Sequence, residues 1–242
     1  MKITNQKILI TGGATGIGLG LAGRFLEDNN TIIICGRRAE VLDAAREKFP
    51  GLITRVCDLS NAAEREALYT WIAEAHPDLG ILINNAGIQQ WMGIDDRDFM
   101  ERALLEMAIN MEAPVHLCLL FSRLPGVHTI MNVSSGLAFT PLTKTPVYSA
   151  TKAFLHSFTL SLRYLLEPKN IRVIELIPPA LNTDLGGKGL HDQAPPVSDF
   201  IEAVFNQLEA GKLTCTFGFS AAMAAAGPAE LQQAFERMNP AR

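Results

Sequence analysis

Short apolar runs alternate with longer amphipathic segments along most of the chain. The short runs are nearly continuous in Ile, Val and Leu, which is typical of strands covered on both faces. They predict strands at 7–11, 31–35, 53–57, 81–84, 129–133, 172–177 and 213–217. The longer segments follow a helical period and predict helices at 17–27, 41–49, 62–75, 99–120, 148–166 and 200–209.

This alternation predicts an α/β fold built from βαβ units with right-handed crossovers. We expect a Rossmann-like, doubly wound sheet of seven mostly parallel strands with helices on both faces. No repeat, charge block or linker divides the sequence, so a single domain over residues 1–242 is expected. Residues 182–199 hold three glycines and two prolines, which favours a mobile substrate loop. An alanine-rich run and a final helical stretch make residues 220–242 a C-terminal extension.

Composition narrows the possible partners and compartment. The formal net charge of −4 lacks the basic footprint of a nucleic-acid binder, and 48% hydrophobic residues can fill a sizeable core. We expect no membrane partner, because no stretch reaches the ~20 apolar residues needed to cross a bilayer. Cys35, Cys57, Cys118 and Cys215 are far apart with no C-x-x-C pair. That spacing argues against a disulfide framework or metal site and favours the cytoplasm.

A glycine-rich turn follows the first predicted strand directly. The segment Thr11-Gly-Gly-Ala-Thr-Gly-Ile-Gly18 leads into a predicted helix. Glycines there permit a tight turn and let the backbone and the helix N–H groups approach a pyrophosphate. The candidate cofactor-binding residues are Gly12, Ala14, Thr15, Gly16, Ile17 and Gly18. The simpler alternative is a turn that only joins strand to helix.

The second strand ends without the carboxylate that would bind the ribose 2′-hydroxyl of NAD. Arg37 and Arg38 stand there instead, and a guanidinium pairs well with a 2′-phosphate. NADP(H) is therefore preferred over NAD(H), although both arginines could simply be solvated. Asp58 and Leu59 follow the third strand, where the adenine would lie. Asp58 could instead cap the next helix.

These residues form part of a longer ordered series. The glycine turn is followed by Asn85-Ala86-Gly87 after the fourth strand, then by Asn110, Ser135 and the pair Tyr148-x-x-x-Lys152. In this order and spacing the chain resembles the short-chain dehydrogenase/reductase family over residues 7–183. Within the family it is similar to the branch associated with D-alanyl-lipoteichoic acid operons.

The residues themselves suggest the chemistry. Tyr148 and Lys152 lie one helical turn apart on one face. An ammonium about 4 Å from a phenol would favour phenolate by up to roughly 4 kcal/mol at an effective dielectric of 20. Tyr148 is thus the expected general acid and base, with Ser135 holding the same substrate oxygen. Each residue also has a structural alternative. Ser135 could simply end a strand, Tyr148 could be a packed aromatic side chain, and Asn110 could bond to a kinked backbone.

The resemblance implies further roles. Lys152 would bind the nicotinamide ribose, and Asn110 would orient a water that passes protons to Lys152. Pro178 and Thr183 would contact the cofactor after the sixth strand. Pro179 stands where the family usually has glycine, which puts the path of this loop in question.

The substrate pocket is expected from the segments after three strands. Its candidate walls are Trp91, Leu137, Pro179 and Leu185, with Gln89, Gln90 and Phe139 beside them. These are mostly apolar, which favours a small, largely apolar carbonyl or alcohol substrate. Trp91 could equally be packing, and Lys188 and His191 are more simply solvent-exposed than substrate contacts.

The sequence therefore predicts an NADP(H)-dependent oxidoreductase that moves a hydride between nicotinamide and a carbonyl or alcohol carbon. The alternative is a non-catalytic NADP(H)-binding sensor or regulator, which would be expected to lack Ser135, Tyr148 or Lys152. The family resemblance implies a homodimer or homotetramer formed through the Tyr148 helix and the helix before it. Phe154 and Phe158 could serve that interface or the core, as could Leu155 and Leu162.

Overall fold

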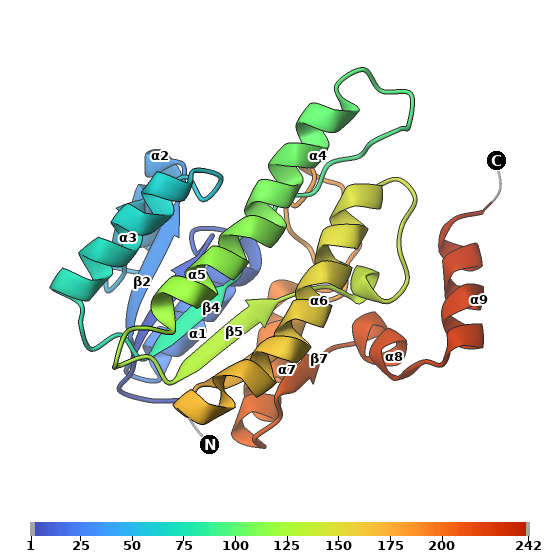
Figure 1. Ribbon diagram of the computed structural model, residues 1–242. Coiled ribbons are helices and arrows are strands. Elements are labelled where there is room, and N and C mark those ends of the chain that lie inside the picture. Colours follow the sequence, from blue (N-terminus) through green and yellow to red (C-terminus); the bar gives the residue numbers. More distant parts are fainter. Residues whose placement is uncertain (1–2, 241–242) are drawn as a thin grey trace.

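A computed structural model describes residues 3–240. These residues contain seven parallel strands in one sheet of order β3-β2-β1-β4-β5-β6-β7, shown in Figure 1. The strands are β1 (Lys7–Thr11), β2 (Thr31–Gly36), β3 (Ile53–Val56), β4 (Ile81–Asn84), β5 (Thr129–Val133), β6 (Arg172–Ile177) and β7 (Thr214–Thr216). The Rossmann-like α/β fold expected from the sequence is confirmed, and every predicted strand is present.

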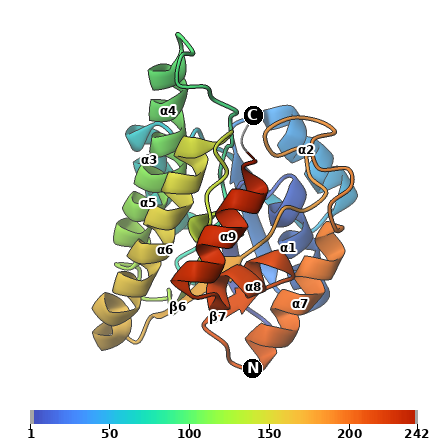
Figure 2. The ribbon, with the colours of Figure 1, turned by 90° about the vertical axis from the view of Figure 1, so that its right-hand side faces the viewer.

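Helices cover both faces of the sheet (Figure 2). One face carries α1 (Gly16–Glu27), α2 (Ala39–Lys48) and α7 (Val197–Glu209). The other carries α3 (Ala62–Ala75), α4 (Phe99–Met107), α5 (Ala113–Phe121) and α6 (Pro146–Leu166). Alternating side chains of each strand supply the two cores: Ile8 and Ile10 pack beneath α1, and Leu9 packs on the opposite side. Burial on both faces explains the continuous apolar runs.

Two further helices follow β7, as the orange-red end of the ribbon in Figure 1 shows. They are α8 (Phe219–Ala225) and α9 (Pro228–Met238). Beyond α9, the side-chain amide of Asn239 accepts the Thr143 N–H at 2.7 Å and donates to the Pro141 carbonyl at 2.9 Å. The end of the described chain is therefore held against the segment that precedes α6.

The helix predicted at 99–120 is continuous but irregular. A π-helix, Ala108–Glu112, separates α4 from α5 and places Asn110 at its centre. By length and composition, Phe99–Phe121 is apolar enough to cross a membrane, which corrects our expectation that no segment would be. Half of its most apolar window is buried within the protein, and a core helix passes the same test.

The strand order changes direction at β1, which pairs with β2 on one side and with β4 on the other. In such sheets a crevice forms at the carboxyl ends of the strands at this switch point. Thr11 joins the two sides of the crevice, since its hydroxyl accepts the N–H groups of Asn85 and Ala86, both at 3.0 Å. The Asn85 side chain donates back to the carbonyls of Thr11 and Gly12. These hydrogen bonds hold the carboxyl ends of β1 and β4 together at the crevice.

Candidate active site

The glycine turn lies at the mouth of this crevice. Gly12 and Gly16 have φ values of +61° and +51°, which side chains rarely adopt. At Gly18 a Cβ would overlap the Gly12 carbonyl and the Asn85 amide and would lie 2.9 Å from the Gly13 Cα. Thr15 precedes α1 without capping it through its side chain, so the first N–H groups of that helix remain available to an anion. The turn therefore has the shape and the free donors of a pyrophosphate cradle.

The remaining residues of this turn have different surroundings. Ala14 and Ile17 are half-buried and pack against the core, whereas Thr15 is exposed. Gly13, which the sequence reasoning left out, is equally constrained, because a Cβ there would overlap Ile34 of β2. Across the crevice a Cβ on Gly12 would lie 2.9 Å from the Ala86 Cα. The close approach of turn and β4 loop thus explains the glycine at position 12.

Arg37 and Arg38 extend from the end of β2 and are exposed. Within residues 3–240 neither side chain has a hydrogen-bond or ion-pair partner, so both guanidinium groups are free to bind an anion. Burial acts to raise the pKa of the nearby Asp58, but hydrogen bonds from Ser60 and the charge of Arg37 bring that pKa below its usual value. Asp58 is thus a carboxylate beside Arg37.

Asp58 does not cap α3, contrary to the alternative that the sequence left open. Its Oδ1 accepts the N–H and hydroxyl of Ser60 at 2.9 and 2.7 Å, and Asn61 caps the helix by accepting the Ala63 N–H. Leu59 is buried in the core, and its carbonyl accepts a hydrogen bond from Arg65 at 2.6 Å.

The residues expected to handle the proton and the substrate oxygen lie at the end of β5 and on α6. Ser135 follows β5 directly, and Tyr148 and Lys152 lie on α6; all three side chains are buried. The Ser135 hydroxyl accepts the Leu137 N–H at 3.1 Å, and Ser135 acts to lower the pKa of Tyr148. The Lys152 Nζ donates to the Val133 carbonyl at 2.9 Å and lies 5.5 Å from the centroid of the Tyr148 ring. The structure therefore brings together the three residues that the sequence placed in this site.

Burial dominates the proton equilibria of these groups. It raises the pKa of Tyr148 above its usual value, and Ser135 lowers it by less. Burial also lowers the pKa of Lys152 to about 8. We expected an ammonium close to the phenol oxygen to make Tyr148 acidic, and that expectation is wrong for this arrangement. The Lys152 amine donates to the Val133 carbonyl, and the loss of solvation is the largest influence on the pKa of Tyr148.

Asn110 reaches the same place from the π-helix. Its Oδ1 accepts the Ile88 N–H at 2.9 Å, while its Nδ2 donates to the Ile88 carbonyl at 2.8 Å and to Thr151 at 3.2 Å. A Cβ on Gly87 would lie 3.4 Å from both the Asn110 Oδ1 and the Lys152 Nζ. Asn110 therefore makes the bond to an irregular backbone that we gave as the alternative to a catalytic role. It also lies close to Lys152.

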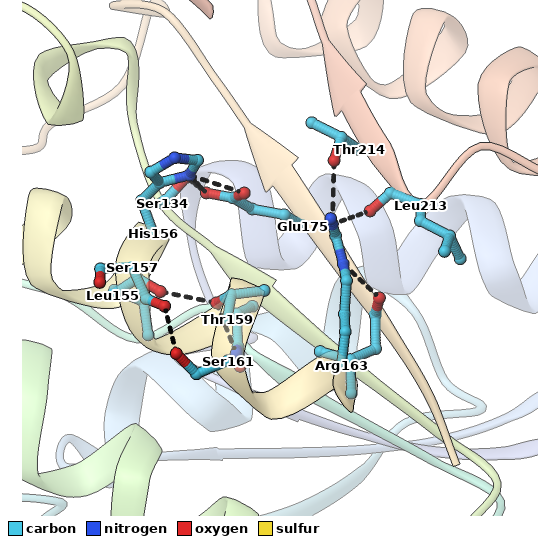
Figure 3. A network of polar contacts seen from close by, with 12 residues as sticks. Ser134, Leu155, His156, Ser157, Thr159, Ser161, Arg163, Glu175, Leu213 and Thr214 are labelled. Carbon is cyan, nitrogen blue, oxygen red and sulfur yellow. Dashed lines mark hydrogen bonds and ion pairs between the residues drawn. The ribbon is translucent and has the colours of Figure 1, made fainter. Parts of the chain in front are cut away.

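A polar network behind Ser135 fixes α6 to the sheet (Figure 3). The buried Glu175 of β6 accepts the Ser134 hydroxyl at 2.5 Å, and the His156 Nδ1 lies 3.0 Å from both of its oxygens. Further along α6, Arg163 donates to the Val173 carbonyl and to the Thr214 hydroxyl. These bonds position the helix that carries Tyr148 and Lys152.

The loop after β6 returns to the glycine turn. A Cβ on Gly16 would lie 3.3 Å from the Thr183 Cγ2, so Thr183 reaches the cofactor side as expected. The Pro178 carbonyl accepts the Gly136 N–H at 3.0 Å. Pro179 in place of glycine therefore leaves this loop in contact with both the turn after Ser135 and the glycine turn.

The four candidate pocket walls differ in exposure. Leu137, Pro179 and Leu185 are half-buried, whereas Trp91 is 46% exposed and lies beneath the Lys144 amine at 5.0 Å. Lys188 is exposed and His191 half-buried. Gly186 lies against Gln89, since a Cβ there would be 2.9 Å from the Gln89 Oε1. The loop at 182–196 thus covers the segment after β4.

Besides Gly13, three residues of the site escaped the sequence reasoning. Thr11 bonds the two sides of the crevice, Thr151 bridges Asn110 to the Tyr148 carbonyl, and Glu106 is buried one turn before Asn110. The spacing of four between Glu106 and Asn110 already placed them on one helix face. Among residues 3–240, no group of three or more His, Cys, Asp or Glu side chains could hold a metal ion.

The fold and this site define a dinucleotide-binding protein of the doubly wound class, with a serine, a tyrosine and a lysine at the carboxyl ends of its strands. Residues 6–194 match the model of the short chain dehydrogenase family. The chain is 41% identical to the oxidoreductase DltE of Bacillus subtilis over 99% of its own length and 98% of that protein.

Two other proteins extend the comparison. The chain is 29% identical, over 71% of each sequence, to the NADP-dependent 3-hydroxy acid dehydrogenase YdfG of Salmonella typhi. A short chain dehydrogenase from Burkholderia cenocepacia, crystallised in complex with NADP, superposes with a TM-score of 0.85 at 26% identity over the whole of both chains. The protein belongs to the short-chain dehydrogenase/reductase family, as its sequence pattern suggested, and its similarity to DltE agrees with the branch we expected.

Proposed function

We propose that this protein is an NADP(H)-dependent oxidoreductase that interconverts a small, largely apolar carbonyl compound and its alcohol. The observation that carries the proposal is the burial of Ser135, Tyr148 and Lys152 together, with the Lys152 amine 5.5 Å from the centroid of the Tyr148 ring. Two hydroxyls at one site can both bind a single substrate oxygen. Family membership supports the reaction class.

The protein's own residues would handle the proton and the substrate oxygen. During reduction Tyr148 gives its phenolic proton to the carbonyl oxygen, and during oxidation it takes the alcohol proton. Ser135 donates a hydrogen bond to that oxygen and fixes its position. Bound NADP(H) would supply or accept the hydride. Lys152 would bind the nicotinamide ribose, and its pKa of about 8 allows its amine to exchange protons near neutral pH. Asn110 would orient the water that exchanges protons with Lys152.

The residues present fit the cofactor. The glycine turn and the free N–H groups of α1 suit a pyrophosphate, and Asp58 and Leu59 lie where the adenine would bind. We assign the rest of the cofactor site to Asn85, Ala86, Gly87, Pro178 and Thr183. The unpaired guanidinium groups of Arg37 and Arg38 favour NADP(H) over NAD(H), and the Burkholderia relative binds NADP.

Replacing Arg37 with alanine should weaken NADPH binding about 10- to 100-fold, the equivalent of one or two charge-assisted hydrogen bonds. NADH has no 2′-phosphate, so its affinity should change little. Fluorescence titration with both cofactors measures the effect. Arg46→Ala is the control, because Arg46 lies on α2 and already pairs with Asp43. Equal losses for NADPH and NADH would contradict the assignment, and Arg38→Ala shows whether the second arginine shares the contact.

An NADPH-oxidation screen tests the reaction itself. The panel should include apolar ketones and aldehydes such as acetophenone, cyclohexanone and benzaldehyde, together with a 3-oxo acid, because YdfG acts on 3-hydroxy acids. The half-buried apolar walls Leu137, Pro179 and Leu185 favour the apolar members. NADPH binding without turnover across the whole panel would favour the non-catalytic sensor instead. No observation in the structure favours that alternative.

We also propose a homodimer or homotetramer that associates through α5 and α6. A hollow of about 630 Å³, with Leu104, Met111, Leu119 and Phe154 in its wall, lies over α3 to α6. Leu119 and Phe154 are 52% and 37% exposed, whereas Leu155 and Leu162 are buried in the domain. Phe154 stacks on the half-buried Phe158. The two phenylalanines thus belong to the outer face, and the two leucines belong to the core.

Leu119→Glu should convert the oligomer to monomers at micromolar concentration, because it places a charge inside a desolvated apolar interface. Light scattering coupled to size-exclusion chromatography measures the mass. Ile94→Glu is the control, since Ile94 is exposed in the loop before α4. An unchanged mass for Leu119→Glu would place the interface elsewhere.

We propose a cytoplasmic location. The four cysteines are free and buried, and burial raises the thiol pKa of Cys57 and Cys215 to about 11. Such thiols suit a reducing compartment in which no disulfide is needed. Cell fractionation with an antibody to the protein tests the location.

A further inference from the structure

The segment that follows β3 has little support from the sheet. β3 is the edge strand of the described sheet and pairs with β2, and its side chains are half-buried or exposed. The ladder continues as far as the Cys57 N–H, which donates to the Gly36 carbonyl at 3.0 Å. Asp58 and Leu59, which we assign to the adenine, follow at the edge of the sheet and need other contacts to hold them in place.

Two side chains from the first turn of α3 supply these contacts. The Glu64 Oε2 accepts the Asp58 N–H at 2.7 Å. The Arg65 Nη1 donates to the Leu59 carbonyl at 2.6 Å. Both bonds act on the main chain of Asp58 and Leu59, so α3 sets the position of this segment.

Arg65 is a fully buried cation, and each nitrogen of its guanidinium group has a partner. The Nε donates to the His116 Nδ1 at 3.1 Å, and the Nη2 pairs with the Glu112 carboxylate. Glu112 belongs to the π-helix and His116 to α5, so Arg65 joins this long helix to the segment after β3. The donors of a guanidinium group point in fixed directions within one plane, so together these contacts define a single position for the Leu59 carbonyl.

Packing of α3 against α5 does not by itself require an arginine. The two helices already contact each other through aromatic side chains, since the Tyr69 and Phe121 ring centroids lie 5.6 Å apart. Burying a charge has a large desolvation cost, which an apolar side chain of similar volume would avoid. The directed hydrogen bond to the Leu59 carbonyl is what an apolar residue at position 65 could not supply.

We propose that Arg65 is a positioning residue for the adenosine half of NADP(H). It acts through Leu59, whose carbonyl it holds toward α3, so that the segment of Asp58 and Leu59 has its binding shape before the cofactor arrives. The inference rests on the proposed function, which assigns Asp58 and Leu59 to the adenine. NADPH and NADH carry the same adenine, so both should depend equally on Arg65, whereas Arg37 should matter mainly for NADPH.

Arg65→Met tests the proposal, because methionine is also long and unbranched but has no charge and no donor. Glu112 is 61% exposed, so its carboxylate stays solvated in the variant. The dissociation constants of NADPH, NADH and ADP-ribose should each rise about 10-fold, the size expected for one lost charge-assisted hydrogen bond. ADP-ribose carries the adenine without the nicotinamide, so its weaker binding would locate the effect in the adenosine half.

The same variant should separate KM from kcat. At saturating NADPH, kcat should stay within about twofold of wild type, because the residues at the end of β5 and on α6 are unchanged. The KM for NADPH should rise with its dissociation constant. Fluorescence titration measures NADPH and NADH, and displacement of NADH measures ADP-ribose.

Arg55→Met is the matched control. Arg55 lies on β3, and its guanidinium group lies 5.0 Å from the centroid of the Trp71 ring of α3. It therefore joins the same two elements, but over an aromatic ring rather than on the Leu59 carbonyl. The affinities for all three ligands should stay within about twofold of wild type. Thermal unfolding establishes that each variant is folded.

Hydrogen exchange in the wild type tests the proposal without a substitution. A segment that is positioned before binding should have slowly exchanging Cys57 and Asp58 amides in the free protein, and NADPH should slow them little further. Fast exchange that becomes slow only with NADPH would overturn the proposal. This measurement decides the matter if Arg65→Met does not fold.

The outcomes separate this inference from the proposed function. A wild-type protein that binds neither NADPH nor NADH contradicts the proposed function. If the wild type binds NADPH, three results for Arg65→Met contradict the role of Arg65. They are unchanged affinities, a loss for NADPH with none for NADH, and a loss of kcat as large as the loss of affinity.

Discussion

Replacing Tyr148 with phenylalanine should lower kcat for ketone reduction by about 100- to 10,000-fold, the usual contribution of a positioned general acid. The ring fills the same buried space, so packing changes little. Only the phenolic hydroxyl is lost. Steady-state NADPH oxidation gives kcat, and fluorescence titration gives the NADPH affinity, which should stay within about twofold because the phenol is required for the proton rather than for the phosphates.

The same helix provides a matched control for that variant. Tyr164 lies on α6 and is 79% exposed, so Tyr164→Phe removes an identical hydroxyl far from Ser135. Its activity should equal that of the wild type. Substantial turnover by Tyr148→Phe would refute the acid–base assignment, and a parallel loss of NADPH binding would show that the substitution had damaged the crevice instead.

Much of this fold could be predicted from the sequence, because burial of a strand on both faces requires a continuous run of apolar residues. Strands such as Ile8–Ile10 and Thr31–Gly36 must be apolar on every side chain that faces a helix layer. The functional residues could be predicted equally well, because each follows a strand end or lies one helical turn from another functional residue. Asn85, Ser135 and the Tyr148–Lys152 pair could thus be placed at one edge of the sheet before any coordinates were known.

The hydrogen bonds and pKa values of the site could not be predicted from the sequence in the same way. Spacing put the Lys152 amine on the face of Tyr148, but it did not show that the amine donates to the Val133 carbonyl. Nor did it show that burial would dominate the pKa of the phenol. These properties depend on the packing of β5 against α6 and on the depth of the site. Glu106 was overlooked because a helical pattern with exposed glutamates on either side does not reveal its complete burial.

The glycine turn was predicted from its glycine positions. Substitution of one of these glycines is expected to have the second large effect. In Gly18→Ala the new Cβ would overlap the Gly12 carbonyl and the Asn85 side chain, so the turn must move away from β4. The displaced turn loses several backbone hydrogen bonds to the pyrophosphate, and NADPH affinity should fall at least about 100-fold.

The cost in folding stability of Gly18→Ala should be about 1–3 kcal/mol, as for other overpacked sites, which leaves a domain of ordinary stability folded. Fluorescence titration measures the NADPH affinity, and chemical denaturation measures the free energy of unfolding. Gly51→Ala is the comparison, since its Cβ would meet only the Leu26 side chain at 3.4 Å. NADPH affinity within a few fold of wild type for Gly18→Ala would mean that the pyrophosphate does not bind against this turn, because any anion held there must contact the backbone that the new methyl group displaces.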